Sequence, residues 1–394
     1  MSGPGLNLHP GATIPFTSRT LAPVVTEWDV AVVGAGVIGL AVARELAEAG
    51  RSVTVLERHE HPALEQSTHN SQVLHSGIFA RPGTLRARLN VEGIRLAYER
   101  ARAWGVRVER SGTLVVAATA AEEPSLERVL TNARENGVPG VVRLLPAEAR
   151  EHEPHLGPCA SALWSPNGGR IDAGGFSAAL EREARRLGAE VRTRFDLVAA
   201  HSEGDGWHLA ARTGETVRAR WVVNSAGVAA GHVAKLLGAP GYRVYPCLGE
   251  YARVVSDKRD WVRSMIYGFP PAGYPGIGVH LTRTVAGELL LGPTARYLDA
   301  PVVPERPLTP LAEFAGEAAR FVPGIGPDDL APAPAGIRCK TVPPGAGEAF
   351  GDFTVALDPP GRRAVQLVGI ESPGLTASLA LAVHVGREIG SPAR

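Results

Sequence analysis

The chain has 394 residues, of which 44% are hydrophobic and 21% charged, and its formal net charge is +1 at pH 7. These values are typical of a soluble globular protein with room for two hydrophobic cores. The near-neutral charge argues against nucleic acid as a partner. Cys159, Cys247 and Cys339 lie far apart without a C-x-x-C pair, so we expect neither a disulfide framework nor a zinc cluster. A reducing, cytoplasmic location fits this pattern best.

Residues 1–26 are rich in Gly, Pro and Thr. They lack the charged start and the continuous apolar stretch of a secretory signal, so we expect a flexible N-terminal arm. Eighteen consecutive apolar residues do not occur anywhere in the sequence, and we therefore expect no transmembrane segment. Peripheral contact with a membrane stays open.

A strand, a glycine turn, a helix and a second strand follow the arm, in the stretch DVAVVGAGVIGLAVARELAEAGRSVTVLER of residues 29–58. Its G-x-G-x-x-G pattern places Gly34 in the tight turn, Gly36 where backbone amides approach a pyrophosphate, and Gly39 where helix and strand pack closely. Glu57 ends the second strand and can accept ribose hydroxyls. This βαβ unit predicts a dinucleotide site and leaves NAD and FAD open.

The segment STHNSQVLHSG, Ser67 to Gly77, is polar and has little hydrophobic periodicity. His69 and His75 could both supply imidazole nitrogens to a metal ion. Their spacing matches neither a helical i, i+4 pair nor a zinc finger, and no cysteine lies nearby. We therefore predict no metal site.

Two later segments indicate that the chain returns to the first sheet. An apolar run at 219–223 precedes Asn224-Ser225-Ala226-Gly227 and a helical stretch. Near the C-terminus an apolar strand, a turn at 369–374 and a helix from about Leu375 repeat this design. The start of that helix can aim backbone N–H groups at an electron-rich acceptor. We therefore expect a discontinuous nucleotide-binding domain.

Segments between these returns alternate apolar and polar residues, at 107–118, 245–255 and 287–297. Such alternation predicts antiparallel strands with one covered face. Helical patterns at 122–136 and 311–321 connect them. These segments predict a second domain built on a sheet.

The sequence resembles the FAD-dependent oxidoreductases of the D-amino-acid-oxidase superfamily, and within that superfamily it resembles the L-2-hydroxyglutarate oxidase or dehydrogenase family. The resemblance covers roughly residues 29–389, and the stretches that carry it are HNSQVLHSGIFARPGTLRARL, NGVPG, GVHLTR, PAGIR and ESPGLTAS. It implies an α/β (α+β overall) fold with a Rossmann-like FAD-binding domain and an inserted, mainly antiparallel β-sheet substrate domain. The implied FAD-binding domain comprises residues 27–105, 158–240 and 340–394. The implied substrate-binding domain comprises residues 106–157 and 241–339.

The resemblance also assigns roles to individual residues. His75 lies in the loop that this family places near the flavin ring, which makes it the candidate base for the substrate hydroxyl proton, with His280 next. Arg338 and Tyr251 lie in pocket segments, and a guanidinium suits the carboxylate of a 2-hydroxy acid. Arg283 is the candidate for a second carboxylate. The implied cofactor contacts are Gly34, Gly36, Gly39, Glu57, Asn70, Ser71, Ala226, Gly227, Gly374, Leu375 and Thr376.

Three positions depart from the family pattern. Leu248 stands where an arginine is usual, Thr294 replaces an asparagine, and Gln72 replaces a glycine. If that arginine grips a distal carboxylate in relatives, its absence puts 2-hydroxyglutarate itself in doubt as the substrate.

Three functions therefore stay open. The first is oxidation of a 2-hydroxy acid, L-2-hydroxyglutarate or a relative, to the 2-oxo acid by hydride transfer to FAD. The second is oxidation of an amine or amino acid on the same fold. The third is a non-catalytic flavin-binding protein, because the fold alone does not fix the function. The expected electron acceptor is oxygen or a respiratory quinone.

Overall fold

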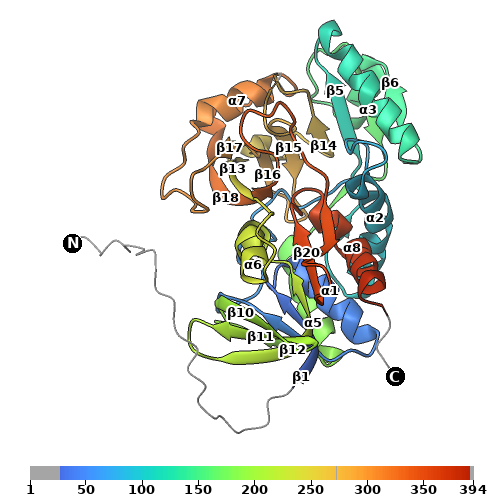
Figure 1. Ribbon diagram of the computed structural model, residues 1–394. Coiled ribbons are helices and arrows are strands. Elements are labelled where there is room, and N and C mark those ends of the chain that lie inside the picture. Colours follow the sequence, from blue (N-terminus) through green and yellow to red (C-terminus); the bar gives the residue numbers. More distant parts are fainter. Residues whose placement is uncertain (1–26, 272, 391–394) are drawn as a thin grey trace, which may run out of the picture.

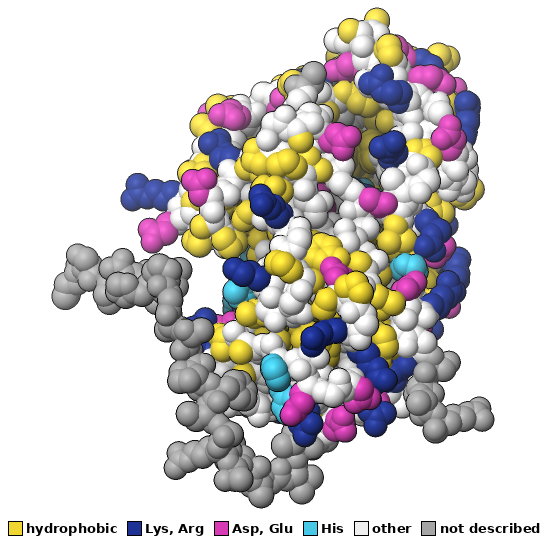
Figure 2. All heavy atoms as spheres, viewed as in Figure 1, with side chains coloured by type: hydrophobic (Ala, Val, Ile, Leu, Met, Phe, Trp, Pro, Cys, Tyr) yellow, Lys and Arg dark blue, Asp and Glu magenta, His cyan; other side chains and the backbone are white. Residues whose placement is uncertain are grey.

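The computed structural model describes residues 27–271 and 273–390, so the expected N-terminal arm lies outside the described residues. Figure 1 shows two units, with α1, α5 and β10–β12 in the lower one and β13–β17 and α7 in the upper one. Figure 2 shows acidic and basic side chains interspersed over the visible face. In the part of the chain that the structure describes, no helix has the length and apolar character needed to cross a bilayer.

The lower unit is built on an eight-stranded sheet to which the chain returns from distant parts of the sequence. Strand β1 pairs in parallel with β2 on one side and β12 on the other, β2 pairs in parallel with β9, and β12 with β20. Antiparallel strands extend the sheet at the β12 edge. The strands are β1 (Glu27–Val33), β2 (Val53–Leu56), β9 (Glu190–Arg192), β10 (Leu197–Glu203), β11 (Gly206–Ala211), β12 (Thr216–Asn224), β19 (Thr354–Leu357) and β20 (Ala364–Val368).

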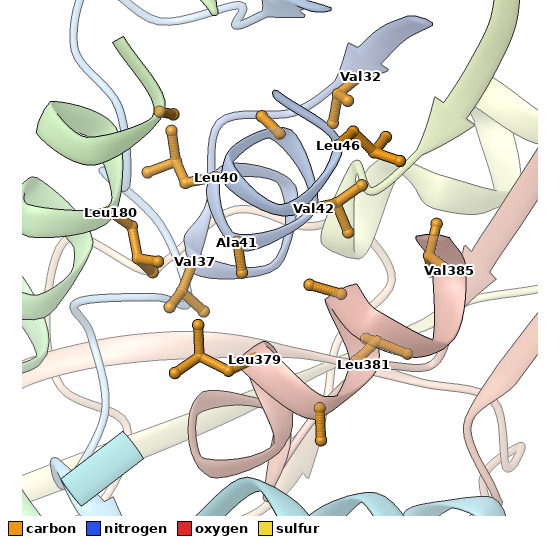
Figure 3. Packing of buried hydrophobic residues seen from close by; sticks show 14 of the residues in the cluster. Val32, Val37, Leu40, Ala41, Val42, Leu46, Leu180, Leu379, Leu381 and Val385 are labelled. Carbon is orange, nitrogen blue, oxygen red and sulfur yellow. The ribbon is translucent and has the colours of Figure 1, made fainter. Parts of the chain in front are cut away.

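Helix α1 (Val37–Glu48) is apolar on most of its surface, and such a helix is stable only when it is covered on several sides. It packs between α5 (Ala173–Arg186) and α8 (Gly374–Ile389), as Figure 3 shows. Helix α2 (Leu85–Ala103) packs against α8, and α6 (Ala230–Leu236) lies near β20. Together these elements form the expected Rossmann-like unit.

The upper unit is a nine-stranded sheet that is antiparallel except where β14 pairs with β5. Helices α3 (Glu123–Glu135), α4 (Pro146–His152) and α7 (Leu311–Ala319) contact its strands, so both expected connecting helices are present. The strands are β5 (Thr113–Ala117), β6 (Val142–Leu144), β7 (Ser161–Ser165), β13 (Tyr245–Val254), β14 (Met265–Tyr267), β15 (His280–Arg283), β16 (Leu289–Gly292), β17 (Arg296–Tyr297) and β18 (Leu330–Lys340).

A small three-stranded sheet of β3 (Val73–Leu74), β4 (Val108–Glu109) and β8 (Gly169–Ile171) completes the fold. Four short 3-10 helices lie in the described connections: η1 (Ala120–Glu122), η2 (Gly227–Ala229), η3 (Asp257–Asp260) and η4 (Pro327–Asp329).

One expected domain boundary is wrong. The sequence predicts that the FAD-binding domain resumes at residue 158. In the structure β7 (Ser161–Ser165) pairs with β5 along its whole length and lies in the upper sheet. The strand is only five residues long, so its periodicity does not reveal which sheet it joins. The chain re-enters the lower unit after β7, through β8 and α5.

We predict that Gly93→Ala lowers the free energy of unfolding by about 1–3 kcal/mol, as overpacking typically does. A Cβ at Gly93 in α2 would lie 2.4 Å from the Thr376 carbonyl oxygen in α8. The matched control is Gly316→Ala in α7, where a Cβ meets nothing within 4 Å and alanine favours the helix. Urea unfolding measures both variants. Equal stability of the two variants would contradict this account of the α2–α8 contact.

Candidate active site

A large cavity lies between the lower sheet, the loop at 63–75 and strand β18. Its empty volume, counting the open mouth, is about 1830 Å³. Residues of the glycine turn, the loop at 63–75, β18 and the start of α8 line this one continuous cavity, so a ligand bound in it can contact all of these segments. The sequence-predicted residues that line it are Gly34, Gly36, Glu57, Asn70, Ser71, His75, Ala226, Gly227, Tyr251, His280, Arg338, Gly374 and Leu375.

Three glycines lie in or beside the turn at one end of the cavity, and a Cβ at each of them would collide with neighbouring atoms. Gly34 has φ +99°, and a Cβ there would lie 2.8 Å from the Ser225 carbonyl oxygen. A Cβ at Gly36 would lie 2.9 Å from Ser67 Oγ, and one at Gly39 would lie 1.9 Å from the Gly34 carbonyl oxygen. Gly34 and Gly36 therefore keep the wall open to a ligand. Gly39 does not line the cavity and instead lets α1 pack on the turn.

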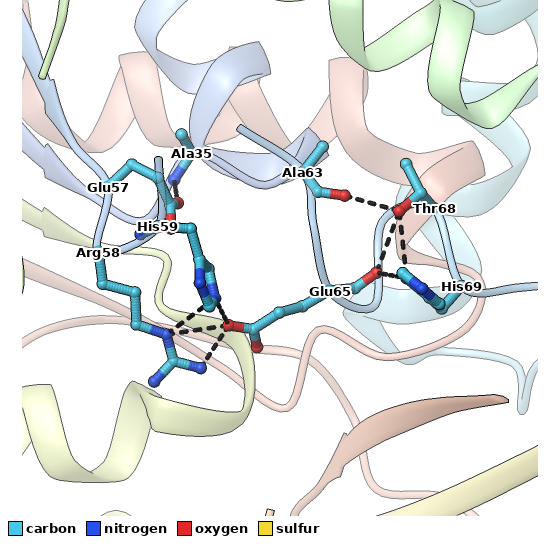
Figure 4. A network of polar contacts seen from close by, with 8 residues as sticks. All are labelled: Ala35, Glu57, Arg58, His59, Ala63, Glu65, Thr68 and His69. Carbon is cyan, nitrogen blue, oxygen red and sulfur yellow. Dashed lines mark hydrogen bonds and ion pairs between the residues drawn. The ribbon is translucent and has the colours of Figure 1, made fainter. Parts of the chain in front are cut away.

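Glu57, at the end of β2, ties the glycine turn to the following loop. Its carboxylate accepts hydrogen bonds from the backbone N–H of Ala35 at 2.8 Å and of His59 at 2.9 Å (Figure 4). His59 Nε2 in turn lies 2.6 Å from Glu65 Oε1, which also pairs with Arg58. Glu57 is buried yet lines the cavity, so its carboxylate stands where ribose hydroxyls can be accepted.

This end of the cavity fits the adenosine diphosphate half of a dinucleotide. Helix α1 begins at Val37, whose backbone N–H donates to Ser67 Oγ at 2.9 Å. The partial positive charge of a helix N-terminus favours a pyrophosphate beside this first turn. The absent Cβ of Gly36 leaves room for that approach.

The loop at Ser67–Gly77 is held by its own side chains. Asn70 Nδ2 donates to the carbonyl oxygens of Gln66 at 3.0 Å and Ser67 at 2.8 Å, and Asn70 Oδ1 accepts from the Gln72 N–H at 2.8 Å. Gln72 has φ +60°, in the left-handed region that favours glycine. The glycine expected from the family pattern at this position therefore has a conformational reason, and glutamine adopts the same backbone at some cost.

Helix α8 fixes the far end of this loop. The His75 N–H donates to Thr376 Oγ1 at 3.0 Å, and that hydroxyl donates to the Val73 carbonyl oxygen at 3.4 Å. Thr376 is buried and does not line the cavity, whereas Gly374 and Leu375 before it do. Thr376 thus positions the loop.

Two imidazoles and a tyrosine meet at the other end of the cavity. The ring of His280 stacks on Tyr267 with centroids 4.2 Å apart, and the ring of His75 lies 6.2 Å from the same tyrosine. His75 Nε2 contacts Ser372 Oγ at 3.2 Å, and His280 Nδ1 lies 3.3 Å from the Gly278 carbonyl oxygen. The structure brings the two candidate histidines to one tyrosine, Tyr267, which the sequence analysis does not single out.

Both imidazoles are neutral at physiological pH. Burial lowers the pKa of His75 to about 3, and the charges of Arg86 and Arg338 act in the same direction. Burial also lowers the pKa of His280 to about 3. The sequence predicts a base that titrates near neutrality. In the structure the surrounding protein buries both rings, and burial disfavours the charged imidazolium.

Three polar atoms at this end are buried without a hydrogen-bond partner among the described residues: Arg338 Nη1, His280 Nε2 and the Tyr267 hydroxyl. Burial raises the pKa of both Tyr267 and Tyr251, so their hydroxyls stay protonated donors. Buried polar atoms are nearly always paired in folded proteins. A ligand with a carboxylate and a hydroxyl or amino group supplies the matching partners.

Arg283 is not brought to this cluster. Its guanidinium pairs with Asp260 at 2.6 Å and does not line the cavity. Leu248 is fully buried in β13, and Thr294 bonds the backbone of Glu250. Neither Leu248 nor Thr294 lines the cavity, so neither departure from the family pattern changes a surface that the substrate would contact directly.

Sequence reasoning also missed three charged side chains near His75. Arg86 is buried and donates to the carbonyl oxygens of Ser372 and Gly351. Lys340 and Glu371 form a buried ion pair. Arg86 lies within one of the family stretches, which is the signal that could have found it. Among the described residues no three His, Cys, Asp or Glu side chains are placed to hold a metal ion.

The two histidines predict a pH dependence of stability. The pKa of each is about 3 in the folded protein against the ordinary 6.5, so below about pH 6.5 the unfolded chain binds protons that the folded chain does not. The free energy of unfolding should therefore fall as the pH drops, by up to about 1.4 kcal/mol per pH unit for each histidine. It should be flat above about pH 6.5.

Urea unfolding at a series of pH values tests this expectation. His75→Asn and His280→Asn should each flatten the dependence, and replacement of the exposed His201 by asparagine should not. An identical slope in all four proteins would show that neither buried ring is the cause.

The chain is similar to known proteins over most of its length. The family model described as "FAD dependent oxidoreductase" matches residues 29–387. The human "L-2-hydroxyglutarate dehydrogenase, mitochondrial" is 27% identical over 96% of this chain and 92% of its own length, and the Escherichia coli "L-2-hydroxyglutarate dehydrogenase" is 25% identical over 91% and 92%. The Caenorhabditis elegans "L-2-hydroxyglutarate dehydrogenase, mitochondrial" is 28% identical over 92% of this chain and 93% of its own length.

Solved structures show the same fold. The "L-alpha-Glycerophosphate Oxidase from Mycoplasma pneumoniae with FAD bound" superposes with a TM-score of 0.84, at 25% identity over 92% of this chain and 95% of that chain. Glycine oxidase from Geobacillus kaustophilus follows at a TM-score of 0.79 and 23% identity, over 93% and 96%. These matches confirm the expected fold and cofactor: the chain belongs to the FAD-dependent oxidoreductase family, and FAD is its cofactor.

Proposed function

We propose that the protein oxidises a 2-hydroxy acid, L-2-hydroxyglutarate or a close relative, to the 2-oxo acid. The names of its curated relatives support this substrate class. The observation that carries it is the buried, unpartnered Nη1 of Arg338 beside two neutral imidazoles. A guanidinium binds a carboxylate, and a neutral imidazole accepts the proton of the adjacent hydroxyl.

FAD supplies the hydride acceptor when it is bound, and the chain's own residues do the rest. We propose that Gly34, Gly36, Ala226 and Gly227 leave room for FAD along the cavity wall. Glu57 accepts hydrogen bonds from the ribose hydroxyls of FAD. Asn70, Ser71, Gly374 and Leu375 line the cavity beyond that end. Arg338 Nη1 and His280 Nε2 are buried, and the electrostatic interactions of buried groups are stronger than those in bulk water.

Substrate binding should also prepare the base. The positive charge of Arg338 lowers the pKa of both imidazoles. A bound carboxylate offsets that charge, so the pKa of the imidazoles rises and the base strengthens when substrate is present. Tyr251 lines the cavity, so its hydroxyl can donate to the substrate's oxygens, whereas Tyr267 is fully buried and stacks on His280.

Of the two candidate bases, the geometry favours His280. A proton on Nδ1 can donate to the Gly278 carbonyl oxygen, which leaves the lone pair of the unpartnered Nε2 free to accept. His75 Nε2 already contacts Ser372 Oγ. His75 remains the alternative base, and otherwise shapes the cavity from the loop.

Anaerobic mixing of the yellow protein with 2-hydroxy acids and amino acids tests the proposed function. A 2-hydroxy acid should bleach the flavin, and reoxidation by oxygen or by a quinone then identifies the class of electron acceptor. Arg338→Lys keeps the charge but loses the planar fork, so the substrate Kd should rise by roughly tenfold or more. Arg283→Lys, outside the cavity, is the control. Bleaching by amino acids alone would identify an amine oxidase. The absence of bleaching by either class of compound would identify a non-catalytic flavoprotein.

Single-turnover reduction tests the base. His280→Asn should slow flavin reduction by roughly 10²-fold or more with FAD still bound, as loss of a general base does. His75→Asn should slow it less. The reverse order would assign the proton transfer to His75, and two unchanged rates would remove both histidines from this role.

A further inference from the structure

A buried ion pair that the proposed reaction does not use lies at the wall of the cavity. Lys340, the last residue of β18, is 0% exposed, and Glu371, just before α8, is 3% exposed. Lys340 Nζ lies 3.3 Å from Glu371 Oε1 and also donates to the Ala349 carbonyl oxygen. The Phe350 ring covers the ammonium, with its centroid 4.5 Å from Nζ.

The second carboxylate oxygen of Glu371 has no partner. Oε2 is buried without a hydrogen bond within 27–271 and 273–390, and Glu371 lines the cavity. A buried carboxylate oxygen without a donor is costly, so a donor that occupies the cavity is expected to satisfy it. The substrate's carboxylate cannot be that donor because the two negative charges repel.

The start of α8 adds a donor to the same cavity. The first backbone N–H groups of a helix lack partners within the helix, and Leu375, in the first turn of α8, lines the cavity together with Glu371. The cavity wall therefore carries both an acceptor and a donor. The pyrimidine edge of oxidised flavin carries the complementary groups, the N3–H donor and its two neighbouring carbonyl oxygens.

We propose that Glu371 Oε2 accepts the hydrogen bond of the flavin N3–H and that Lys340 balances the carboxylate, so that this pair sets the reduction potential of the bound FAD. The inference rests on FAD as the cofactor and does not depend on the substrate. A negative charge beside the pyrimidine edge disfavours the extra negative charge of reduced flavin, and the ammonium of Lys340 offsets part of that effect.

Glu371→Gln is the direct test. The amide keeps the shape and an acceptor oxygen, but it removes the negative charge while Lys340 remains. FAD should stay bound, and its midpoint potential, titrated against reference dyes without substrate, should rise by about 30 mV, which is a tenfold change in the two-electron equilibrium constant.

Asp329→Asn is the matched control. Asp329 pairs with Lys258 at 2.7 Å, as Glu371 pairs with Lys340, but it does not line the cavity. Its replacement should leave the potential unchanged. A Glu371→Gln potential equal to that of the parent and of Asp329→Asn would overturn the proposal, whatever the outcome with 2-hydroxy acids.

A second measurement needs no substitution. Apoprotein of the parent sequence is titrated with FAD and with 3-methyl-FAD, in which a methyl group replaces the N3 proton. The expected result is at least a tenfold weaker Kd for the methylated cofactor, because the bond to Glu371 cannot form. Equal affinity for the two cofactors would overturn the proposal even if the Glu371→Gln protein fails to fold.

Discussion

The close approach of three backbone segments around the glycine turn is the constraint on which the rest of the structure depends. Gly34 touches the carbonyl of Ser225, and Gly39 touches the carbonyl of Gly34, with no space for a Cβ at either position. Ser225 Oγ also donates to the Val33 carbonyl oxygen at 2.9 Å, which joins the ends of β1 and β12. Because these contacts fix where β12 ends relative to α1, they also fix the wall of the cavity.

A second close approach joins the two units. A Cβ at Gly336 in β18 would lie 2.2 Å from the His69 carbonyl oxygen, so this strand rests directly on the cavity loop. Gln66 bridges the same junction, since it accepts from the Cys339 N–H at 3.1 Å and donates to the Ile370 carbonyl oxygen at 3.2 Å. The loop, β18 and the segment after β20 are therefore joined directly beside the cavity. These contacts fix where Arg338 of β18 lies relative to the loop, which is the support that a preorganised binding site needs.

The sequence predicts those parts of the site that have a local pattern. The turn, α1 and Glu57 follow one another within a short segment, and their spacing carries the chemistry. The parts that it misses depend on contacts between distant segments. Tyr267 reads as the apolar end of a short strand, and Lys340 and Glu371 meet only because β18 and the loop before α8 end side by side. The strand β7 is assigned to the wrong unit for the same reason, since its pairing with β5 leaves no local trace.

The charges around the substrate end also constrain what can bind there. Among the buried or half-buried groups, Arg86, Arg338 and Lys340 supply three positive charges and Glu371 supplies one negative charge, whereas Asp352 is exposed to solvent. These charges therefore differ by two positive charges, which two carboxylates would neutralise. Recognition of a diacid here would draw on this surplus, with no arginine at Leu248 and no contribution from Arg283.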